Sequence, residues 1–196
     1  MIRILDLLFS LLGVLFLTPL FLMISLIIPL DSRGPVFFLQ TRVGKNNRDF
    51  RLIKFRTMRK DAWKEGGLTI GAHDRRITRV GRFLRNGKLD EIPQLINVLK
   101  GDMSLVGPRP ELRKYVDLYT VDQRKVLSVR PGITDWASIT YFRENEILGQ
   151  SENPEETYIR EILPAKIELN MRFIRDPSLH HYLGIIRRTI FRPCAA

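Results

Sequence analysis

One long apolar run near the amino terminus constrains this chain more than any other feature. Between Ile4 and Leu30, Asp6 is the only charged residue. At about 1.5 Å of rise per residue, a helix over this run would be roughly 40 Å long, against ~30 Å for the hydrocarbon core of a bilayer. We therefore expect a membrane element at residues 1–30 and a more polar domain at residues 31–196.

Pro19 lies in the middle of this run, directly after Thr18. Proline removes one helical hydrogen bond and clashes with the preceding turn, so a sharp bend is expected there. Basic residues flank the run on both sides, at Arg3 before it and at Arg33, Arg42 and Lys45 after it. Because positive charge favours the cytoplasmic side, we expect both ends on that side and a re-entrant helix-break-helix with its break at Thr18 and Pro19. An ordinary span with a proline kink is the alternative.

The start of the run carries its own signal. Asp6 follows Arg3 by one helical turn, which predicts an ion pair at the membrane surface, because an isolated acid deeper in lipid would be costly. A cleavable signal peptide is disfavoured, because the apolar region is too long and no Ala-x-Ala-like site follows it. The segment is therefore expected to be retained.

The chain is strongly basic, with a formal net charge of +11. Between Arg33 and Lys60, nine Lys or Arg residues face a single acid, Asp49, and further arginines follow at Arg75, Arg76, Arg79, Arg82 and Arg85. This surplus predicts an anionic partner, which could be lipid head groups, sugar-nucleotide phosphates or nucleic acid, and the apolar run favours a membrane. Cys194 is the only cysteine, which excludes an internal disulfide and is consistent with a reducing cytoplasm.

Hydrophobic patterns predict an α+β fold that is mainly helical with a small β-hairpin. The expected strands are residues 34–40 and 50–56, separated by Gly44–Asn47, and the glycine-rich residues 63–73 are expected to form a loop. Helices are expected from Ile77 to Arg85, from Pro93 to Leu99 and over residues 111–127. The last third predicts two amphipathic helices broken around Asp176 and Pro177, and the second could also lie in the membrane interface.

The adjacent acids Asp90 and Glu91 are the strongest candidate for an active site. Neighbouring carboxylates repel one another, so a basic chain keeps them side by side most plausibly where metal, phosphate or arginine relieves the repulsion. The alternative is an acidic start to the helix near Pro93, where the helix dipole alone would favour negative charge.

Features near this dyad favour phosphate chemistry. A carboxylate can serve as nucleophile toward phosphorus, and a neighbouring acid can hold Mg²⁺, which prefers oxygen ligands together with substrate phosphates. The arginines of the helix expected from Ile77 lead into the dyad. Prolines on both sides of Arg109, in Gly107–Pro110, limit backbone freedom, so its guanidinium could clamp a diphosphate; a simple tight turn is the alternative.

Other site classes are excluded by the motifs they require. Leu89 replaces the Ser or Thr that a Walker loop would need after Gly81–Lys88, and there is no Gly-x-Ser-x-Gly elbow. The histidines, His73, His180 and His181, lack the spacing of a zinc site.

Several motifs together resemble a known family, the monotopic phosphoglycosyl transferases among the bacterial sugar transferases. In chain order they are Arg3-x-x-Asp6, Thr18-Pro19, Phe37–Gly44, Lys54–Met58, Leu89–Leu95, Asn97–Ser104, Gly107–Pro110 and Arg130–Thr134. Single motifs are weak, but their number and order across nearly the whole chain are specific. The resemblance implies a monotopic enzyme at the cytoplasmic face of the bacterial inner membrane.

By the same resemblance, the enzyme moves a phospho-sugar from a UDP-sugar to polyprenol (undecaprenyl) phosphate and releases UMP. Asp90 matches the family's nucleophile, which implies a ping-pong mechanism through an aspartyl phospho-sugar, and Glu91 matches its Mg²⁺-associated partner. The residues implied to bind phosphate or uridine are Lys54, Arg85, Arg109 and Arg130. Thr18 and Pro19 match the family's re-entrant break.

The chain departs from the commoner family pattern at Thr18, at Lys88 and at Asp135–Ser138, which leaves the donor sugar open. Compared with the family's larger members it is expected to be a minimal catalytic unit, and whether it forms a homodimer is left open.

Two other functions compete with the enzyme. One is a membrane-tethered nucleic-acid-binding protein built on the arginines of residues 75–85, which is disfavoured because stacking aromatics are sparse and the acids would repel a backbone. The other is a noncatalytic scaffold for a glycan pathway.

Overall fold

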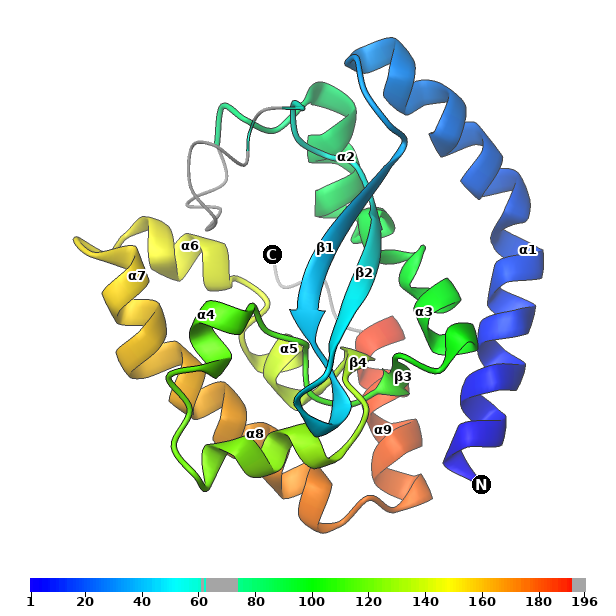
Figure 1. The fold of residues 1–196 in the computed structure, drawn as a ribbon. Coiled ribbons are helices and arrows are strands. Elements are labelled where there is room, and N and C mark those ends of the chain that lie inside the picture. Colours follow the sequence, from blue (N-terminus) through cyan, green and yellow to red (C-terminus); the bar gives the residue numbers. More distant parts are fainter. Residues whose placement is uncertain (61, 63–73, 192–196) are drawn as a thin grey trace.

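The computed structural model describes residues 1–60, 62 and 74–191, and Figure 1 shows their arrangement. The long helix α1 (Ile2–Asp31) lies along one side of the molecule, the hairpin of β1 (Phe37–Val43) and β2 (Asp49–Phe55) crosses the middle, and shorter helices fill the other side. The predicted loop at residues 63–73 and Cys194 lie outside the described residues.

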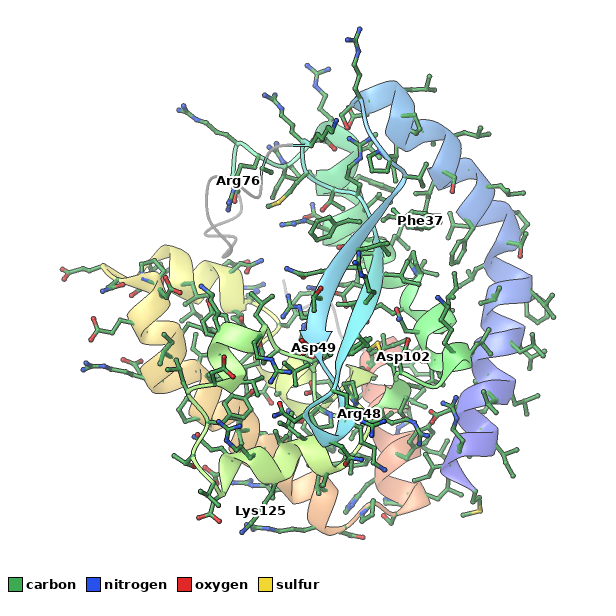
Figure 2. The ribbon with its side chains drawn as sticks, viewed as in Figure 1. Phe37, Arg48, Asp49, Arg76, Asp102 and Lys125 are labelled. Atoms are coloured by element: carbon green, nitrogen blue, oxygen red, sulfur yellow. The ribbon has the colours of Figure 1, made fainter. Side chains whose placement is uncertain are left out.

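Helix α1 buries polar residues only in its first part, and the side that faces away from the protein is apolar. Asp6 and Ser10 are buried, together with Ile24 and Ile28 nearer the other end. The exposed large apolar residues of α1 include Ile4, Leu8, Leu11, Leu15, Phe16, Leu22, Leu26 and Leu30. Figure 2 shows side chains projecting from this outer side, away from the rest of the chain. Because a helix in water has the opposite distribution, this pattern is typical of an outer face in lipid, and α1 is long and apolar enough to cross a membrane.

The structure corrects the prediction that α1 breaks into two helices at Thr18 and Pro19. The helix is continuous from Ile2 to Asp31 with Pro19 inside it, and Figure 1 shows it bending so that its later half leans over α2. Proline removes a single hydrogen bond, and the hydroxyl of Thr18 donates to the carbonyl oxygen of Val14 at 2.7 Å, so the helix bends without ending. The re-entrant path through a bilayer stays a prediction.

Both ends of α1 are fastened to the polar domain. At the first turn, Arg3 donates to the carbonyl oxygens of Val98 and Met103. The predicted ion pair between Arg3 and Asp6 is confirmed, with 4.0 Å between the charged atoms. At the last turn, Asp31 accepts a hydrogen bond from the backbone N–H of Val80. A single domain therefore holds the beginning and the end of the apolar helix.

The predicted hairpin is confirmed. Strands β1 and β2 pair antiparallel in the register Phe37 with Phe55 and Val43 with Asp49, and Figure 2 shows Phe37 and Arg48 at opposite ends of the hairpin. The turn is the short 3-10 helix η1 (Lys45–Asn47), in which Asn46 and Asn47 have φ of 56° and 62°. Asparagine tolerates this left-handed conformation, which explains its use in the turn.

The segment between the hairpin and the second sheet is helical as expected. It contains α2 (Arg79–Asn86), a 3-10 turn η3 (Leu89–Glu91) and α3 (Gln94–Lys100). Helix α1 packs on α2 and α3, where Gly13 allows the side chain of Leu95 to approach closely.

A second, parallel sheet was not predicted. It pairs β3 (Ser104–Val106) with β4 (Gly132–Thr134). The backbones of Gly107 and Gly132 meet so closely that a Cβ on Gly132 would lie 2.1 Å from the nitrogen of Gly107. Parallel strands end at the same edge, so this sheet brings the residues that follow β3 beside those that follow β4.

The predicted helix over residues 111–127 is wrong. Only α4 (Arg113–Val116) and the 3-10 helix η4 (Gln123–Ser128) form there. Thr120 and Gln123 exchange side-chain-to-backbone hydrogen bonds, in which each side-chain oxygen accepts from the other's N–H. Such local bonds compete with continuous helix, so the segment turns between the two short helices.

The described residues after β4 are mainly helical. Their elements are α5 (Trp136–Thr140), α6 (Glu144–Gly149), α7 (Pro154–Thr157), the π-helical turn η5 (Tyr158–Ile162), α8 (Leu163–Arg175) and α9 (Leu179–Ile190). The two predicted C-terminal helices are confirmed as α8 and α9. The predicted break at Asp176 and Pro177 separates α8 from α9, and Ser178 caps α9 by accepting from the N–H of His181. The buried Tyr182 and Ile185 of α9 lie in one apolar cluster with Ile2 and Leu5 of α1. The last helix therefore packs near the start of the first.

Candidate active site

The acidic dyad lies on η3, between the basic helix α2 and helix α3. Lys88 precedes it with φ 55°, a left-handed conformation that turns the chain sharply out of α2. Helix α3 begins at Gln94 and has no acid in its first turn. The dyad therefore lies on the preceding 3-10 turn η3 and not in the first turn of α3, where the alternative explanation placed it.

Glu91 is held between two cations. The ammonium of Lys54 donates to Oε1 at 3.0 Å. The guanidinium of Arg109 donates to both oxygens, with a distance of 3.1 Å from Nη1 to Oε2. Burial alone would raise the pKa of Glu91, but the charges of Arg109 and Lys54 outweigh burial and hold that pKa well below its usual value. Glu91 is therefore an anion stabilised by two neighbouring cations.

Asp90 is in the opposite situation. Its residue is 7% exposed, and its Oδ1 is buried without a hydrogen-bond partner among the described residues. Burial raises the pKa of Asp90, and the neighbouring charge of Glu91 adds to this, while Lys54 and Arg85 act in the other direction. Two adjacent carboxylates thus have pKa values shifted apart, which is the pattern of acids with separate tasks.

The structure brings Lys54, Arg85 and Arg109 to the dyad. Lys54 and Arg109 contact Glu91. The charge of Arg85 acts on Asp90, while its Nε donates to Thr57 Oγ1 at 2.8 Å. The neighbouring arginines of α2, Arg79 and Arg82, are exposed.

Arg130 is not brought to the dyad. It is exposed, and its Nε donates to the carbonyl oxygen of Gly101 at 2.9 Å. Among the described residues, no hydrogen bond or ion pair joins it to Asp90 or Glu91. Thr18 and Pro19 lie in the middle of α1.

Two further residues support the site and were missed from the sequence. Arg42 donates to the carbonyl oxygen of Pro110 at 3.1 Å and lies 3.6 Å from the carboxylate of Glu111. Asp135 accepts a hydrogen bond from the backbone N–H of Arg109 at 3.0 Å. The only sequence signal for Asp135 is its position in the stretch that departs from the family pattern.

The acids fit a metal that is shared with a substrate. The described residues contain no group of three or more His, Cys, Asp and Glu side chains that could hold a metal alone. Mg²⁺ commonly binds one or two carboxylates and takes its other ligands from substrate phosphates and water. The unpartnered Oδ1 of Asp90 beside the carboxylate of Glu91 is a donor set of this kind.

Comparisons with known proteins identify the family of this chain. The model of the bacterial sugar transferase family matches residues 1–195. The chain is 40% identical to "UDP-N-acetylgalactosamine-undecaprenyl-phosphate N-acetylgalactosaminephosphotransferase" of Aeromonas hydrophila, over 94% of this chain and 41% of that protein. It is 39% identical to "Undecaprenyl-phosphate glucose phosphotransferase" of Komagataeibacter xylinus, over 97% of this chain and 35% of that protein.

A third relative is matched over more of its length. It is the "UDP-glucose:undecaprenyl-phosphate glucose-1-phosphate transferase" of Caulobacter vibrioides, which is 37% identical over 96% of this chain and 67% of that protein. The chain spans about two fifths of the length of the first two relatives. Because the family match covers nearly every residue, this chain belongs to the bacterial sugar transferase family.

Proposed function

We propose that this chain transfers a phospho-sugar from a UDP-sugar to polyprenol phosphate and releases UMP. The observation that carries the proposal is the split dyad, in which Asp90 has a buried, unpartnered oxygen while Glu91 is bound by two cations. The names of the relatives contain a UDP-sugar and undecaprenyl phosphate, and they support the same reaction class.

In the first half-reaction, an oxygen of the Asp90 carboxylate attacks the β-phosphorus of the donor. The bond between that phosphorus and the bridging oxygen breaks, and UMP leaves with the electron pair. In the second half-reaction, a phosphate oxygen of the acceptor attacks the phosphorus of the aspartyl phospho-sugar. The Asp90 carboxylate leaves unchanged, and the product is a polyprenyl diphosphate sugar.

The neighbouring cations give this site its affinity for phosphate. Arg109 presents a planar, bidentate donor, and both Arg109 and Lys54 bind the carboxylate of Glu91. Arg85 supplies positive charge on the side of Asp90. A bound Mg²⁺ would be held by Glu91 and Asp90 and would neutralise charge on the transferred phosphate.

We also propose that α1 enters the inner membrane from the cytoplasmic side and returns to it. The same domain fastens Arg3 at the first turn and Asp31 at the last, which supports placing both ends on one side. The apolar outer face of α1 supports contact with lipid. Cysteines introduced near residue 3 and near residue 45, with Arg3 kept, should be labelled from one compartment, and labelling from opposite compartments would mean a full span.

The reaction is tested with purified protein, Mg²⁺, undecaprenyl phosphate and a panel of UDP-sugars. The expected product is UMP, released with at least one donor. Release of UDP would instead indicate ordinary glycosyl transfer and reject the proposal. Salt-dependent binding of DNA or RNA in a filter assay, without UMP release, would favour the nucleic-acid alternative.

A further inference from the structure

The segment that carries Arg109 has few hydrogen-bond donors of its own. In Gly107–Pro110, both prolines lack an N–H, so Gly107 and Arg109 carry the only backbone N–H donors of the segment. Its carbonyl oxygens are also held, because Pro108 accepts from the N–H of Gly132 and Pro110 accepts from Arg42. The N–H of Gly107 donates to the carbonyl oxygen of Thr134 at 3.0 Å. The N–H of Arg109 donates to Oδ2 of Asp135 at 3.0 Å. The side chain of Asp135 therefore accepts the backbone hydrogen bond of Arg109, the residue whose guanidinium binds Glu91.

Asp135 is itself rigidly placed. It is 2% exposed and follows β4 directly, at the edge of the sheet where the segment after β3 also begins. Its second oxygen, Oδ1, accepts from the N–H of Ser138 at 2.6 Å and caps helix α5. The close backbone contact of Gly107 with Gly132 fixes the distance between the two segments. Both carboxylate oxygens are thus used, one on α5 and one on the backbone of Arg109.

The charge of Asp135 also faces Arg109. Glu91 is the main cause of the raised pKa of Arg109, and Glu111 and Asp135 add to it against the effect of burial. These acids attract the positive charge of the guanidinium, and the hydrogen bond from the Arg109 backbone limits where that charge can lie. A misplacement of about 1 Å in a substrate-positioning group can lower a rate by roughly 10²-fold.

We infer that Asp135 is a positioning residue that acts through Arg109, holding its backbone so that the guanidinium is aimed at Glu91 and the donor diphosphate. The inference rests on the proposed function, because it assigns Asp135 a part in donor phosphate transfer. The competing explanation is that Asp135 only caps α5, and the two explanations call for different variants.

Asp135→Ser separates the two roles. Serine is also a preferred N-cap residue, so it can keep the bond to the N–H of Ser138, but it has one oxygen and cannot also reach Arg109. The reaction is followed without acceptor, as the burst of UMP upon mixing with donor. The amplitude of the burst counts competent sites, whereas its rate reports the chemistry. We expect an unchanged amplitude and a rate lower by about tenfold.

A double-mutant cycle then asks whether Asp135 acts through Arg109. In an Arg109→Ala background, Asp135→Ser should lower the burst rate less than about twofold, because its target is gone. If Arg109→Ala does not fold, Arg109→Lys serves in its place, since it keeps the charge and loses the bidentate grip. Asp122→Ser, at an exposed ion pair with Lys125, is the matched control and should match the parent.

The outcomes are distinguishable. A lower amplitude at an unchanged rate, or full additivity of the two substitutions, would overturn positioning in favour of a structural role. An unchanged rate in Asp135→Ser would also overturn it. Failure of the parent protein to release UMP with any donor would instead reject the proposed function.

Discussion

Asp6 and Asp90 are both buried aspartates, yet the protein surrounds them in opposite ways. Asp6 is 2% exposed and accepts hydrogen bonds from Ser104 Oγ and the Leu105 N–H at 2.9 Å and from Tyr182 Oη at 2.8 Å. Asp90 is 7% exposed and leaves Oδ1 unpartnered among the described residues. The carboxylate of Asp6 links α1 to β3 and α9 through hydrogen bonds. Oδ1 of Asp90 makes no such link among the described residues.

This difference separates a structural acid from a reactive one. Leaving a buried polar group without a partner costs about 1–3 kcal/mol, so a fold tolerates it mainly where a ligand or a reaction supplies the missing partner. A carboxylate that already accepts several hydrogen bonds is stabilised and is a poor nucleophile. Asp6 thus stabilises the fold, whereas the proposed function places the chemistry at Asp90, at the expense of stability.

The largest effect on activity is expected from Asp90→Asn. Removing the nucleophile should lower turnover by at least about 10³-fold. Thermal unfolding should occur at the same or a higher temperature, because burial penalises the charge that the substitution removes. UMP release and melting are measured on the same preparation, with Asp122→Asn as an exposed control. Substantial turnover would contradict the assignment, and glycan assembly restored in a deletion strain by the inactive variant would favour a scaffold.

Glu91→Gln should destabilise the protein, unlike Asp90→Asn. It leaves the partly buried charges of Lys54 and Arg109 without their partner. Breaking a fully buried pair costs about 3–5 kcal/mol, and the partial exposure of Arg109 makes the expected cost smaller. Chemical denaturation should show this loss, and turnover should fall as well. A variant as stable as the parent would mean that Glu91 is not the anion that holds the two cations.

Asp6→Asn should lower stability and spare the chemistry. With the amide oxygen in place of Oδ1, the amide nitrogen would stand where Oδ2 accepts from Ser104 Oγ and pairs with Arg3, and an unsatisfied buried group costs about 1–3 kcal/mol. The burst rate per competent site should stay within about twofold of the parent, since α1 contacts Glu91 and Asp90 nowhere in the described hydrogen bonds. A large fall in that rate would erase the distinction between the two acids.

The two halves of the dyad should also separate with pH. Asp90 must be ionised to attack, and its pKa is raised, so the burst rate should fall as pH drops through a value above that of an ordinary aspartate. Glu91 has a lowered pKa, so its contribution to stability is present above the unfolded pKa of about 4.3 and is lost only as pH falls through the lower folded value. As the pH is lowered, the protein should therefore lose activity before it unfolds. The burst rate measures the activity, and circular dichroism measures the folded structure. Loss of structure before loss of rate would contradict this order.

The smallest effect is expected at Arg130. Its guanidinium is exposed and bonds the carbonyl oxygen of Gly101, so Arg130→Ala should lower kcat/KM for the donor by less than about threefold. Arg109→Ala, which removes a bidentate grip on Glu91, should lower it at least tenfold more. A reversed order would place the donor near Arg130 and revise the position of the phosphate site.

Local patterns predicted those parts of the molecule whose structure is decided locally. The hairpin, helices α2 and α9, and the grouping of Lys54, Arg85 and Arg109 around the dyad agree with the sequence-based expectations, the last through family resemblance. Strands β3 and β4 were missed, because three residues show no period and their pairing joins segments far apart in the chain. Asp135 was missed for the same reason, since its role depends on that pairing.

At α1 the sequence correctly indicated a bend but not its form. A proline predicts the loss of one hydrogen bond, and whether the helix ends there depends on packing at both ends, which is nonlocal. Family resemblance suggested that Arg130 binds phosphate or uridine. A shared motif identifies a residue but does not say which atoms it contacts, and here Arg130 bonds the carbonyl oxygen of Gly101.

The central claim is that Asp90 forms a covalent bond with the phospho-sugar, and intact-protein mass spectrometry tests it most directly. Protein is mixed with a donor that supports turnover, quenched before acceptor is added, and weighed beside Asp90→Asn treated in the same way. The account predicts a mass increase of one phospho-sugar per chain, located on the peptide containing Asp90, which disappears upon addition of polyprenol phosphate and is absent from the variant. Turnover in the complete reaction without any such adduct, or an adduct on another residue, would contradict it.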